Sequence, residues 1–397
     1  MALAAVTANA RALGIPAVLA QAGPRVTPGE TASILGIIAS ATLTFLGVVF
    51  TLTLVALQLA SAQLSPRVVR MFVRSGVTKL AFGILLAAFS YCVAFLVLEN
   101  GRHAADSGGL AVAMGLVTAS LVVFLGYVAS TMRLLQVAFV ITRVAQETRA
   151  EVGRAFPAIG GYVRAAPAGL TGRPGIIRLP DRGRRSAGVI QAVNYRALAR
   201  LAERHDCVLA LLARPGQYLP GGGAVIAVHG GTPVPARAAL AAIRVGRART
   251  VDQDPAFGLR QLADIAAQAL SAAVNQPTTA VQVLDRLGDL LLCIGRQADR
   301  TGFYAGSRGQ VRVIEPVAGW ADLLDLALSE ITAYGAGSVQ VRRRLLAVFD
   351  ALEAGLPPAR QPAVAALRAA LLASAGAGAD DGAARPADAR ADVLGLG

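Results

Sequence analysis

The sequence predicts an α-helical integral membrane domain joined to a cytosolic α+β region, in which a small β-rich module precedes a helical domain. The membrane domain is predicted by the run from Thr31 to Pro66, which holds 36 consecutive residues without a charged side chain. A helix needs only about 20 residues to cross a hydrocarbon core of roughly 30 Å. The α+β region is predicted because short apolar segments bounded by Gly and Pro follow residue 156, and helical periodicity resumes after residue 234.

Composition divides the chain into six segments. They are a weak N-terminal segment (1–30), a transmembrane domain (31–133) with spans at about 34–60, 80–98 and 110–132, an amphipathic stalk helix (134–156), a β-rich cytosolic module (157–233), a helical cytosolic domain (234–374) and a disordered tail (375–397). The tail is expected to be disordered because its few large apolar side chains cannot offset the entropy lost on folding.

The arginine distribution predicts the orientation of the spans. The connection between the first two spans carries three arginines and Lys79, whereas residues 99–109 between the second and third spans carry a single arginine. Positively charged connections remain on the cytoplasmic side. The N-terminus is therefore expected on the extracytoplasmic side of the membrane, and everything after the third span is expected in the cytoplasm.

Within the cytosolic region, the apolar patterns predict short strands followed by helices. Strands are expected at 161–164, 175–178, 188–193, 207–213 and 224–228, with a helix at 196–204 between them. Helices are expected at 236–245, 257–273, 277–300, 319–335, 337–354 and 360–374.

The composition argues against several classes of protein. The net charge is +14, but Lys79 is the single lysine among 38 basic residues, and no stretch combines a basic face with the aromatic residues that stack on bases. Nucleic acid is therefore not an expected partner. The three cysteines and three histidines are isolated in sequence, so the chain predicts no metal site, no cofactor and no disulfide.

Three blocks of sequence resemble the signature of a bacterial family of predicted membrane proteins of unknown function. The first block is TLTLVALQLAS at 51–61 with QLSPR at 63–67. The second block is Arg214-Pro215-Gly216, which follows His205-Asp206. The third block runs from Arg249 to Asp285 and contains RTVDQD, FG, QL, DIA, ALS, Asn275, Pro277 and Asp285. Departures from the family pattern are Gln276 in place of Asp, Ala272 in place of Pro and Gln217 in place of Asp. The resemblance supports the architecture and implies no particular activity.

The first span carries polar residues on one helical face. Ser40, Thr44, Thr51 and Gln58 follow one another in steps of 4 or 7 positions, so they project within roughly 40° of one another. One interpretation is that this small, polar face packs closely against another helix. The other is that copies of the span surround a pathway in a homo-oligomer, with these side chains lining it.

The end of the first span is a predicted membrane interface. Ser65, Pro66 and Arg67 follow the apolar run, where proline ends or bends a helix and arginine reaches the headgroups. The favoured interpretation is an anchor; a cytoplasmic gate or a contact with anionic lipid is the alternative.

The densest polar cluster of the second half is a possible regulatory site. Its residues are Arg249, Asp252, Asp254, Asp264, Asn275 and Asp285, together with Arg260. Interleaved charges of this kind favour an ion-pair and capping network, in which Asp254 before Pro255 is the expected N-cap of a helix. A ligand or hard-cation site is the alternative. No catalytic residue is predicted, because no nucleophile or phosphate-binding loop accompanies the acids.

These observations predict a passive ion channel or transport-type protein with a regulatory cytosolic region. The alternatives are a membrane-anchored sensor or scaffold without transport activity and, third, a membrane-bound enzyme. The lipid bilayer and further copies of the same chain are the expected partners.

Overall fold

The fold is described from a computed structural model. It covers residues 28–63, 76–99, 107–134, 136–155, 170, 173–181 and 187–377. The chain forms two compact units, which are residues 1–137 and residues 138–397. Residues 1–27 of the predicted N-terminal segment, the predicted strand at 161–164 and the interface residues Ser65, Pro66 and Arg67 lie outside the described residues.

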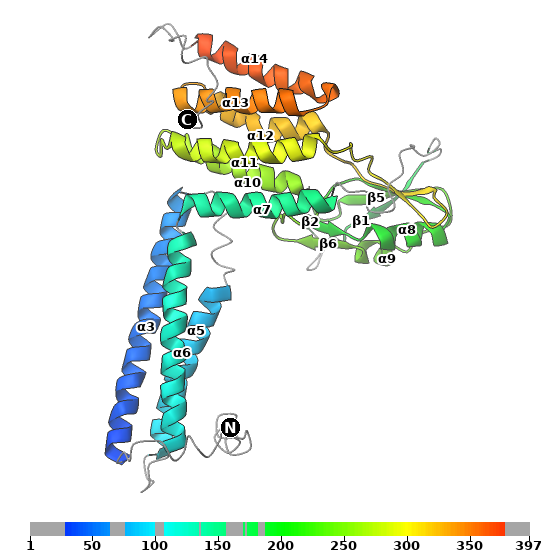
Figure 1. Cartoon of the computed structure of the whole chain (residues 1–397). Helices are drawn as coiled ribbons and strands as arrows, with labels where there is room; N and C mark the ends of the chain where they lie inside the picture. Colours follow the sequence, from blue (N-terminus) through cyan, green and yellow to red (C-terminus); the bar gives the residue numbers. More distant parts are fainter. Residues whose placement is uncertain are drawn as a thin grey trace. The chain divides into compact units, whose positions relative to one another are not determined.

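The first unit contains three apolar helices that are long enough to cross a membrane. They are α3 (Pro28–Gln63), α5 (Gly76–Glu99) and α6 (Ser107–Leu134), and their candidate spans are Gly29–Gln58, Gly76–Val97 and Gly109–Arg133. The spans predicted from the sequence fall on these helices, because an uninterrupted apolar run of this length has a strong local signal. The three helices are drawn in blue and cyan in Figure 1.

Two apolar clusters define how these helices pack. Leu35 of α3 packs with Cys92 of α5 and Ala113 of α6, whereas Val49, further along α3, packs with Leu85 and with Tyr127. The order of residues is therefore reversed between α3 and α5 and the same between α3 and α6. The three helices form an up, down, up bundle, the arrangement required if each one crosses a bilayer.

The second unit begins with α7 (Val137–Ala155), which corresponds to the amphipathic helix predicted at 134–156. Its buried side chains recur every three or four residues, at Ile141, Val144, Thr148 and Glu151. Thr148 lies directly against Gly258 of α10 (Pro255–Ala269), where a Cβ on the glycine would be 1.8 Å from Thr148 Oγ1. This face of α7 is therefore covered by the helical part of its own unit, as Figure 1 shows.

Two sheets form the β-rich part of this unit. Their strands are β1 (Gly175–Arg178), β2 (Gly188–Val193), β3 (Val208–Leu211), β4 (Tyr218–Leu219), β5 (Ala224–His229), β6 (Ile243–Gly246), β7 (Phe303–Ala305) and β8 (Val311–Ile314). One sheet has the order β1-β5-β3-β8-β7 and the other the order β4-β2-β6. All neighbours are antiparallel except β3 and β8, which are parallel.

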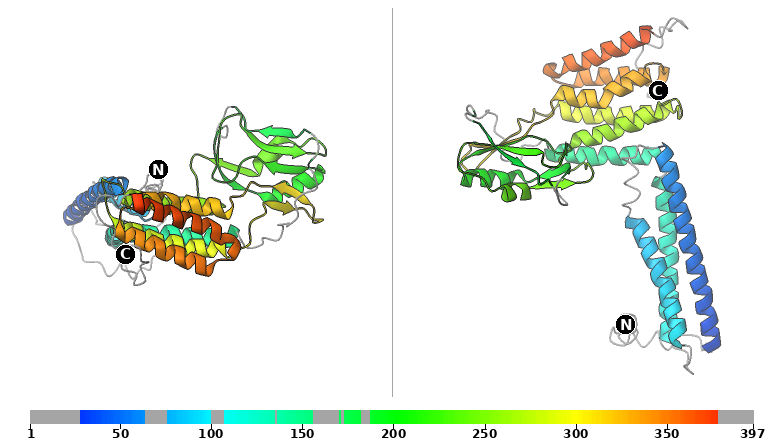
Figure 2. Two further views of the ribbon diagram at one scale, coloured as in Figure 1. Left: turned by 90° about the horizontal axis from the view of Figure 1, so that it is seen from above. Right: turned by 180° about the vertical axis from the view of Figure 1, so that it is seen from behind.

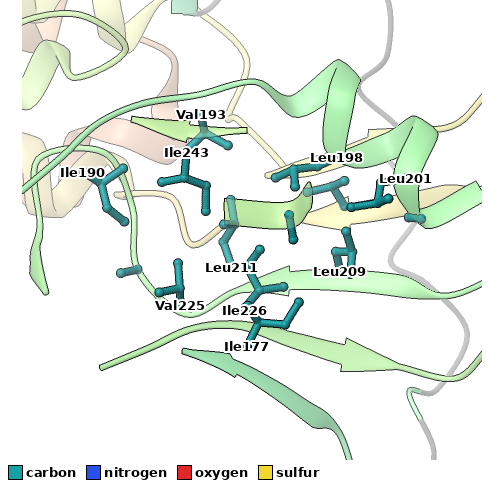
Figure 3. Packing of buried hydrophobic residues seen from close by; sticks show 14 of the residues in the cluster. Ile177, Ile190, Val193, Leu198, Leu201, Leu209, Leu211, Val225, Ile226 and Ile243 are labelled. Atoms are coloured by element: carbon teal, nitrogen blue, oxygen red, sulfur yellow. The ribbon is translucent and has the colours of Figure 1, made fainter. Parts of the chain in front are cut away.

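Apolar side chains from both sheets and from two short helices share one core. The helices are α8 (Tyr195–Arg204) and α9 (Ala236–Ala241). Figure 3 shows Leu198 and Leu201 of α8 facing Leu209, while Ile190 and Ile243 of the second sheet face Val225. The sheets and helices therefore form a single α+β module.

The predicted boundary between the β-rich module and the helical domain at 233/234 is wrong. The helix expected at 236–245 ends at Ala241 and is followed by strand β6, and β7 and β8 return to the first sheet from a part of the chain assigned to the helical domain. Short apolar runs such as 243–246 and 311–314 do not distinguish a strand from a helix by periodicity. Only pairing with β2 and β3 identifies them as strands.

The remaining helices form a stacked bundle. After α10 come α11 (Pro277–Gly295), α12 (Trp320–Gly335), α13 (Val339–Gly355), a 3-10 turn (Pro358–Arg360) and α14 (Gln361–Ala377). α10 packs on α11 and α12, α11 packs on α13, and α14 packs on α12 and α13, as the two views in Figure 2 show. The helix α14 reaches residue 377, so the predicted tail at 375–397 overlaps its end; residues 378–397 lie outside the described part.

Candidate functional site

The polar face of α3 is exposed in the single chain. Ser40, Thr44, Thr51 and Gln58 are all exposed, whereas the buried face carries Leu35, Ile38, Thr42, Val49 and Ala56. Both sets recur with steps of three, four or seven, and they are offset by two positions, or about 200° around the helix. The predicted polar face therefore points away from α5 and α6.

The hydroxyl groups of this face are bonded within the helix. Thr44 Oγ1 donates to the carbonyl of Ser40 at 2.9 Å, and Thr51 Oγ1 donates to the carbonyl of Gly47 at 3.0 Å. Each hydroxyl oxygen keeps acceptor capacity after donating its proton. The face can therefore offer oxygen atoms to a cation, to water or to a neighbouring helix.

The polar contacts between the helices come from residues that the sequence did not single out. Thr53 Oγ1 and the Tyr127 hydroxyl are 2.6 Å apart, and the same hydroxyl donates to the carbonyl of Val49 at 3.1 Å. Near the other end of the bundle, Tyr91 donates to the carbonyl of Gly109 at 3.1 Å. Tyr127 is 2% exposed, so it links α6 to α3 from inside the bundle.

In the second unit, Arg249 and Asp254 form the most buried ion pair of the predicted cluster. Arg249 donates twice to the carboxylate, from Nε to Oδ2 at 2.6 Å and from Nη2 to Oδ1 at 3.1 Å. Asp254 Oδ1 also accepts from the backbone N–H of Phe257 at 3.2 Å, which confirms it as the N-cap of α10. The guanidinium lies 5.1 Å from the centre of the Phe257 ring.

The second and third sequence blocks meet at this ion pair. Gly216 has a φ of +88° and leaves so little space that a Cβ would lie 2.0 Å from Asp254 Oδ2. Its N–H donates to the carbonyl of Ile190 at 2.8 Å, which ties the turn to strand β2. The motif residues around 214–216 therefore form a support for the helix start, in keeping with a capping network.

Gln253, the neighbour of Asp254, connects three elements. Its side chain pairs with the backbone of Val193, accepting at 2.8 Å and donating at 3.1 Å, and its own N–H donates to Glu151 of α7 at 2.8 Å. Gln253 adopts a φ of +57° in this position. Burial raises the pKa of the Glu151 carboxyl, and the bond from Gln253 and the charge of Arg154 oppose that change.

The other members of the predicted cluster lie in separate contacts. Asp252 pairs with Arg244 at 2.9 Å, Arg260 Nε bonds Asp264 at 2.7 Å, and Asp285 lies 3.4 Å from Arg344. Asn275 has a φ of +46° and follows α10 in the connection to α11. Among the described residues, no group of three or more His, Cys, Asp or Glu side chains has the arrangement of a metal site.

A second buried polar cluster joins α8 to the β7–β8 hairpin. Glu315 accepts from the Tyr304 hydroxyl at 2.7 Å and from Arg300 Nη2 at 3.2 Å, and the rings of Tyr304 and Tyr195 stack with centroids 4.0 Å apart. Burial, together with the nearby charge of Glu315, raises the pKa of Tyr195 far above its usual range. The tyrosines and Glu315 are too distant in sequence for any local pattern to predict this cluster.

Three apolar helices followed by an α+β unit define this chain as a membrane protein with candidate spans near its N-terminus. It belongs to the family described as "Predicted membrane protein (DUF2254)", whose sequence model matches residues 1–351. The resemblance drawn from the three sequence blocks is thereby confirmed.

The chain is also similar to mycobacterial proteins. "Uncharacterized protein Rv1290c" of Mycobacterium tuberculosis (strain H37Rv) and "Uncharacterized protein Mb1321c" of Mycobacterium bovis are each 28% identical over 359 residues. The matched segments cover 85% of this chain and 67% of either relative. No solved structure matches the chain.

Proposed function

We propose that this protein is a passive ion channel or transport-type protein, assembled from several copies of the chain in a bacterial inner membrane. Its C-terminal unit lies in the cytoplasm and regulates it. The observation that supports this proposal is the exposed face of α3, on which Ser40, Thr44, Thr51 and Gln58 follow one another along the candidate span.

The energetics of the bilayer favour covering that face. In the most apolar 18 residues of the three candidate spans, 22%, 28% and 17% are buried, so most of their surface meets either lipid or another protein. An amide such as that of Gln58 is costly to expose to hydrocarbon, where no water can bond it. Contact with copies of α3 around a hydrated pathway would supply hydrogen-bond partners for the Gln58 amide.

The side chains available favour a passive pathway over a carrier driven by proton transfer. The sequence places no acidic or basic residue between Thr31 and Pro66, and none at 80–98 or 110–132. Ion-coupled carriers use buried ionisable groups, whereas channels can select with hydroxyl and carbonyl dipoles and with hydrophobic constrictions.

A short connection along the chain supports regulation by the second unit. α6 ends at Leu134 and α7 begins at Val137, and the N–H of Gln136 donates to the carbonyl of Arg133 at 3.1 Å. A connection of this length lets the start of α7 move only a short distance before it pulls on the end of α6. A rearrangement that displaces α7 would therefore act on the end of α6.

The test is ion flux from proteoliposomes under salt gradients, with wild-type protein and the Thr44→Leu/Thr51→Leu variant. We expect the double variant to lose ion flux, because leucine removes the hydroxyl oxygen atoms that line the pathway and its larger side chain narrows the pathway. Thr118→Leu is the matched control, since Thr118 is an exposed threonine of α6 whose hydroxyl donates to the carbonyl of Met114 at 2.9 Å. Absence of flux from folded, oligomeric wild-type protein under every gradient would refute the proposal.

A membrane-anchored sensor or scaffold is the second candidate, and it is favoured by the shape of the same face. A Cβ built on Gly36 or Gly47 meets nothing within 4 Å, so these positions leave room for a second backbone. In that case Thr44→Leu/Thr51→Leu changes the number of subunits measured by native mass spectrometry, and neither protein conducts ions.

A further inference from the structure

A groove on the α+β module lies between α8 and the turn from β7 to β8. Its volume is about 930 Å³, comparable with clefts that hold small-molecule ligands. Its charged lining consists of four arginines and two carboxylates, namely Arg200, Arg204, Arg308, Arg312, Glu203 and Asp206. The four arginines outnumber the two carboxylates, and the excess of positive charge suggests an anionic ligand.

Both carboxylates are already engaged in holding the walls of the groove. Glu203 accepts hydrogen bonds from the side chain and from the backbone N–H of Ser307, which fix the β7–β8 turn against α8 and lower the pKa of the Glu203 carboxyl. Asp206 accepts from Arg312 Nη2 at 2.9 Å, and Arg312 Nη1 donates to the carbonyl of Cys207 at 3.2 Å. These contacts position the turn and Arg312.

Glu203 keeps its negative charge, because the Ser307 groups that donate to it are neutral, and this charge acts on Arg308 and Arg312. Arg200 and Arg204 donate from Nε to helix carbonyls one turn earlier, each at 3.4 Å. Within the described ranges, neither they nor Arg308 forms an ion pair with a carboxylate within 4 Å. Arg196, Arg200 and Arg204 also follow one another at intervals of four on α8, where like charges repel. A bound anion would relieve that repulsion.

The remaining lining chemistry narrows the class of anion. One guanidinium group can bind two phosphate oxygens through two parallel N–H donors, and the exposed Gln310 amide adds a neutral donor at the same edge. No aromatic side chain is among the lining residues to stack on a base. We infer that this groove binds a multiply charged phosphate group, carried by a soluble compound or by a phospholipid headgroup.

The inference is independent of whether the chain conducts ions, and it can be tested by hydrogen–deuterium exchange on the full chain in nanodiscs. In phosphatidylcholine discs, tripolyphosphate is added at constant ionic strength. In a second arm, discs containing phosphatidic acid, whose phosphomonoester can carry two negative charges, are used without tripolyphosphate. Protection of α8 (Tyr195–Arg204) and of residues 303–314 is the measured quantity. Protection in the first arm identifies a soluble phosphate compound, and protection in the second alone identifies a headgroup.

Two variants make the result specific to the groove. Arg200→Gln/Arg308→Gln removes two of the four arginine charges of the groove and is expected to weaken binding at least ~10-fold, because guanidinium contacts supply most of the attraction. Arg237→Gln/Arg286→Gln removes two exposed arginines outside the groove and should bind as the wild type does. Both variants should melt as the wild type does. The inference is overturned if neither arm protects these segments, or if the two variants lose binding equally.

Discussion

Arg249 Nε lies 2.6 Å from Asp254 Oδ2, and Gly216 approaches that same oxygen so closely that any side chain at position 216 would displace it. Gly216→Ala is therefore expected to lower the free energy of unfolding of the C-terminal unit by about 2–4 kcal/mol. The loss combines a clash with the ion pair and the cost of a positive φ. Fluorescence of Trp320, the single tryptophan, reports this unfolding in the full chain.

Gly230→Ala is the matched control for this prediction. Gly230 also has a positive φ, +74°, but a Cβ there meets nothing within 4 Å. Gly230→Ala should lower the free energy of unfolding by only about 1–2 kcal/mol, which is the part that comes from the positive φ. Equal losses at Gly216 and Gly230 would mean that the close approach to Asp254 contributes nothing.

Gly258→Ala should weaken the packing of α7 on α10. The added Cβ would lie 1.8 Å from Thr148 Oγ1, so one helix must shift. We expect a loss of about 1–3 kcal/mol, measured as a fall in the melting temperature. Gly153→Ala, on the exposed part of α7, should be neutral or slightly stabilising, because alanine is the better helix former. An unchanged melting temperature for Gly258→Ala would contradict the packing described.

Tyr127→Phe should loosen the bundle of the first unit. It removes the hydroxyl that lies 2.6 Å from Thr53 Oγ1 and donates to the carbonyl of Val49. Hydrogen bonds between membrane helices are worth about 0.6 kcal/mol on average, so a loss of that size is expected on unfolding with sodium dodecyl sulfate. Tyr218→Phe, at an exposed tyrosine of β4, is the control and should leave the unfolding midpoint unchanged.

Gln276→Asp should stabilise α11. Gln276 occupies the N-cap position of this helix, and its side chain makes no capping hydrogen bond. An aspartate can accept from the exposed N–H groups of the first turn, with a gain of about 0.5–2 kcal/mol. Gln276→Ala should be close to neutral by the same thermal measurement. A gain from alanine equal to that from aspartate would show that capping is not the cause.

Glu151→Gln should alter the pH dependence of stability. Because burial raises the pKa of Glu151 in the folded chain, its contribution is fully present below the unfolded carboxyl value of about 4.3 and is lost as the pH rises through the folded value. The amide cannot ionise and still accepts from the N–H of Gln253. The melting temperature of the variant relative to the wild type should therefore increase from about pH 4 to pH 7.

The control for this pH experiment is Glu147→Gln, which removes a half-exposed carboxyl from the same helix. A difference that is the same at every pH for Glu151→Gln would indicate that burial has little effect on the proton affinity of Glu151.

Parts of the candidate sites were readable from local sequence. Asp254 before Pro255 predicted the N-cap of α10, and the spacing of Ser40, Thr44 and Thr51 predicted one face of α3. The pairing of Arg249 with Asp254, the contact of Gly216 with Asp254 and the Thr53–Tyr127 hydrogen bond were not predictable. In each case, packing decides the distance between the two residues. One local pattern in the sequence contributes to the groove, namely the arginines at intervals of four on α8. These arginines line a groove only because the β7–β8 turn lies opposite them.

The sequence by itself determined the apolar helices and most helices of the second unit, because transfer to a bilayer and helical amphipathicity are properties of contiguous residues. Only the tertiary structure decided that β8 lies parallel to β3, with Leu209 opposite Val313, and that β6 pairs with β2. A strand of four residues gains its stability from the partner that completes its hydrogen bonds. The paired residues Leu209 and Val313, and likewise Val193 and Ile243, are far apart in the sequence, so no local pattern specifies either pairing.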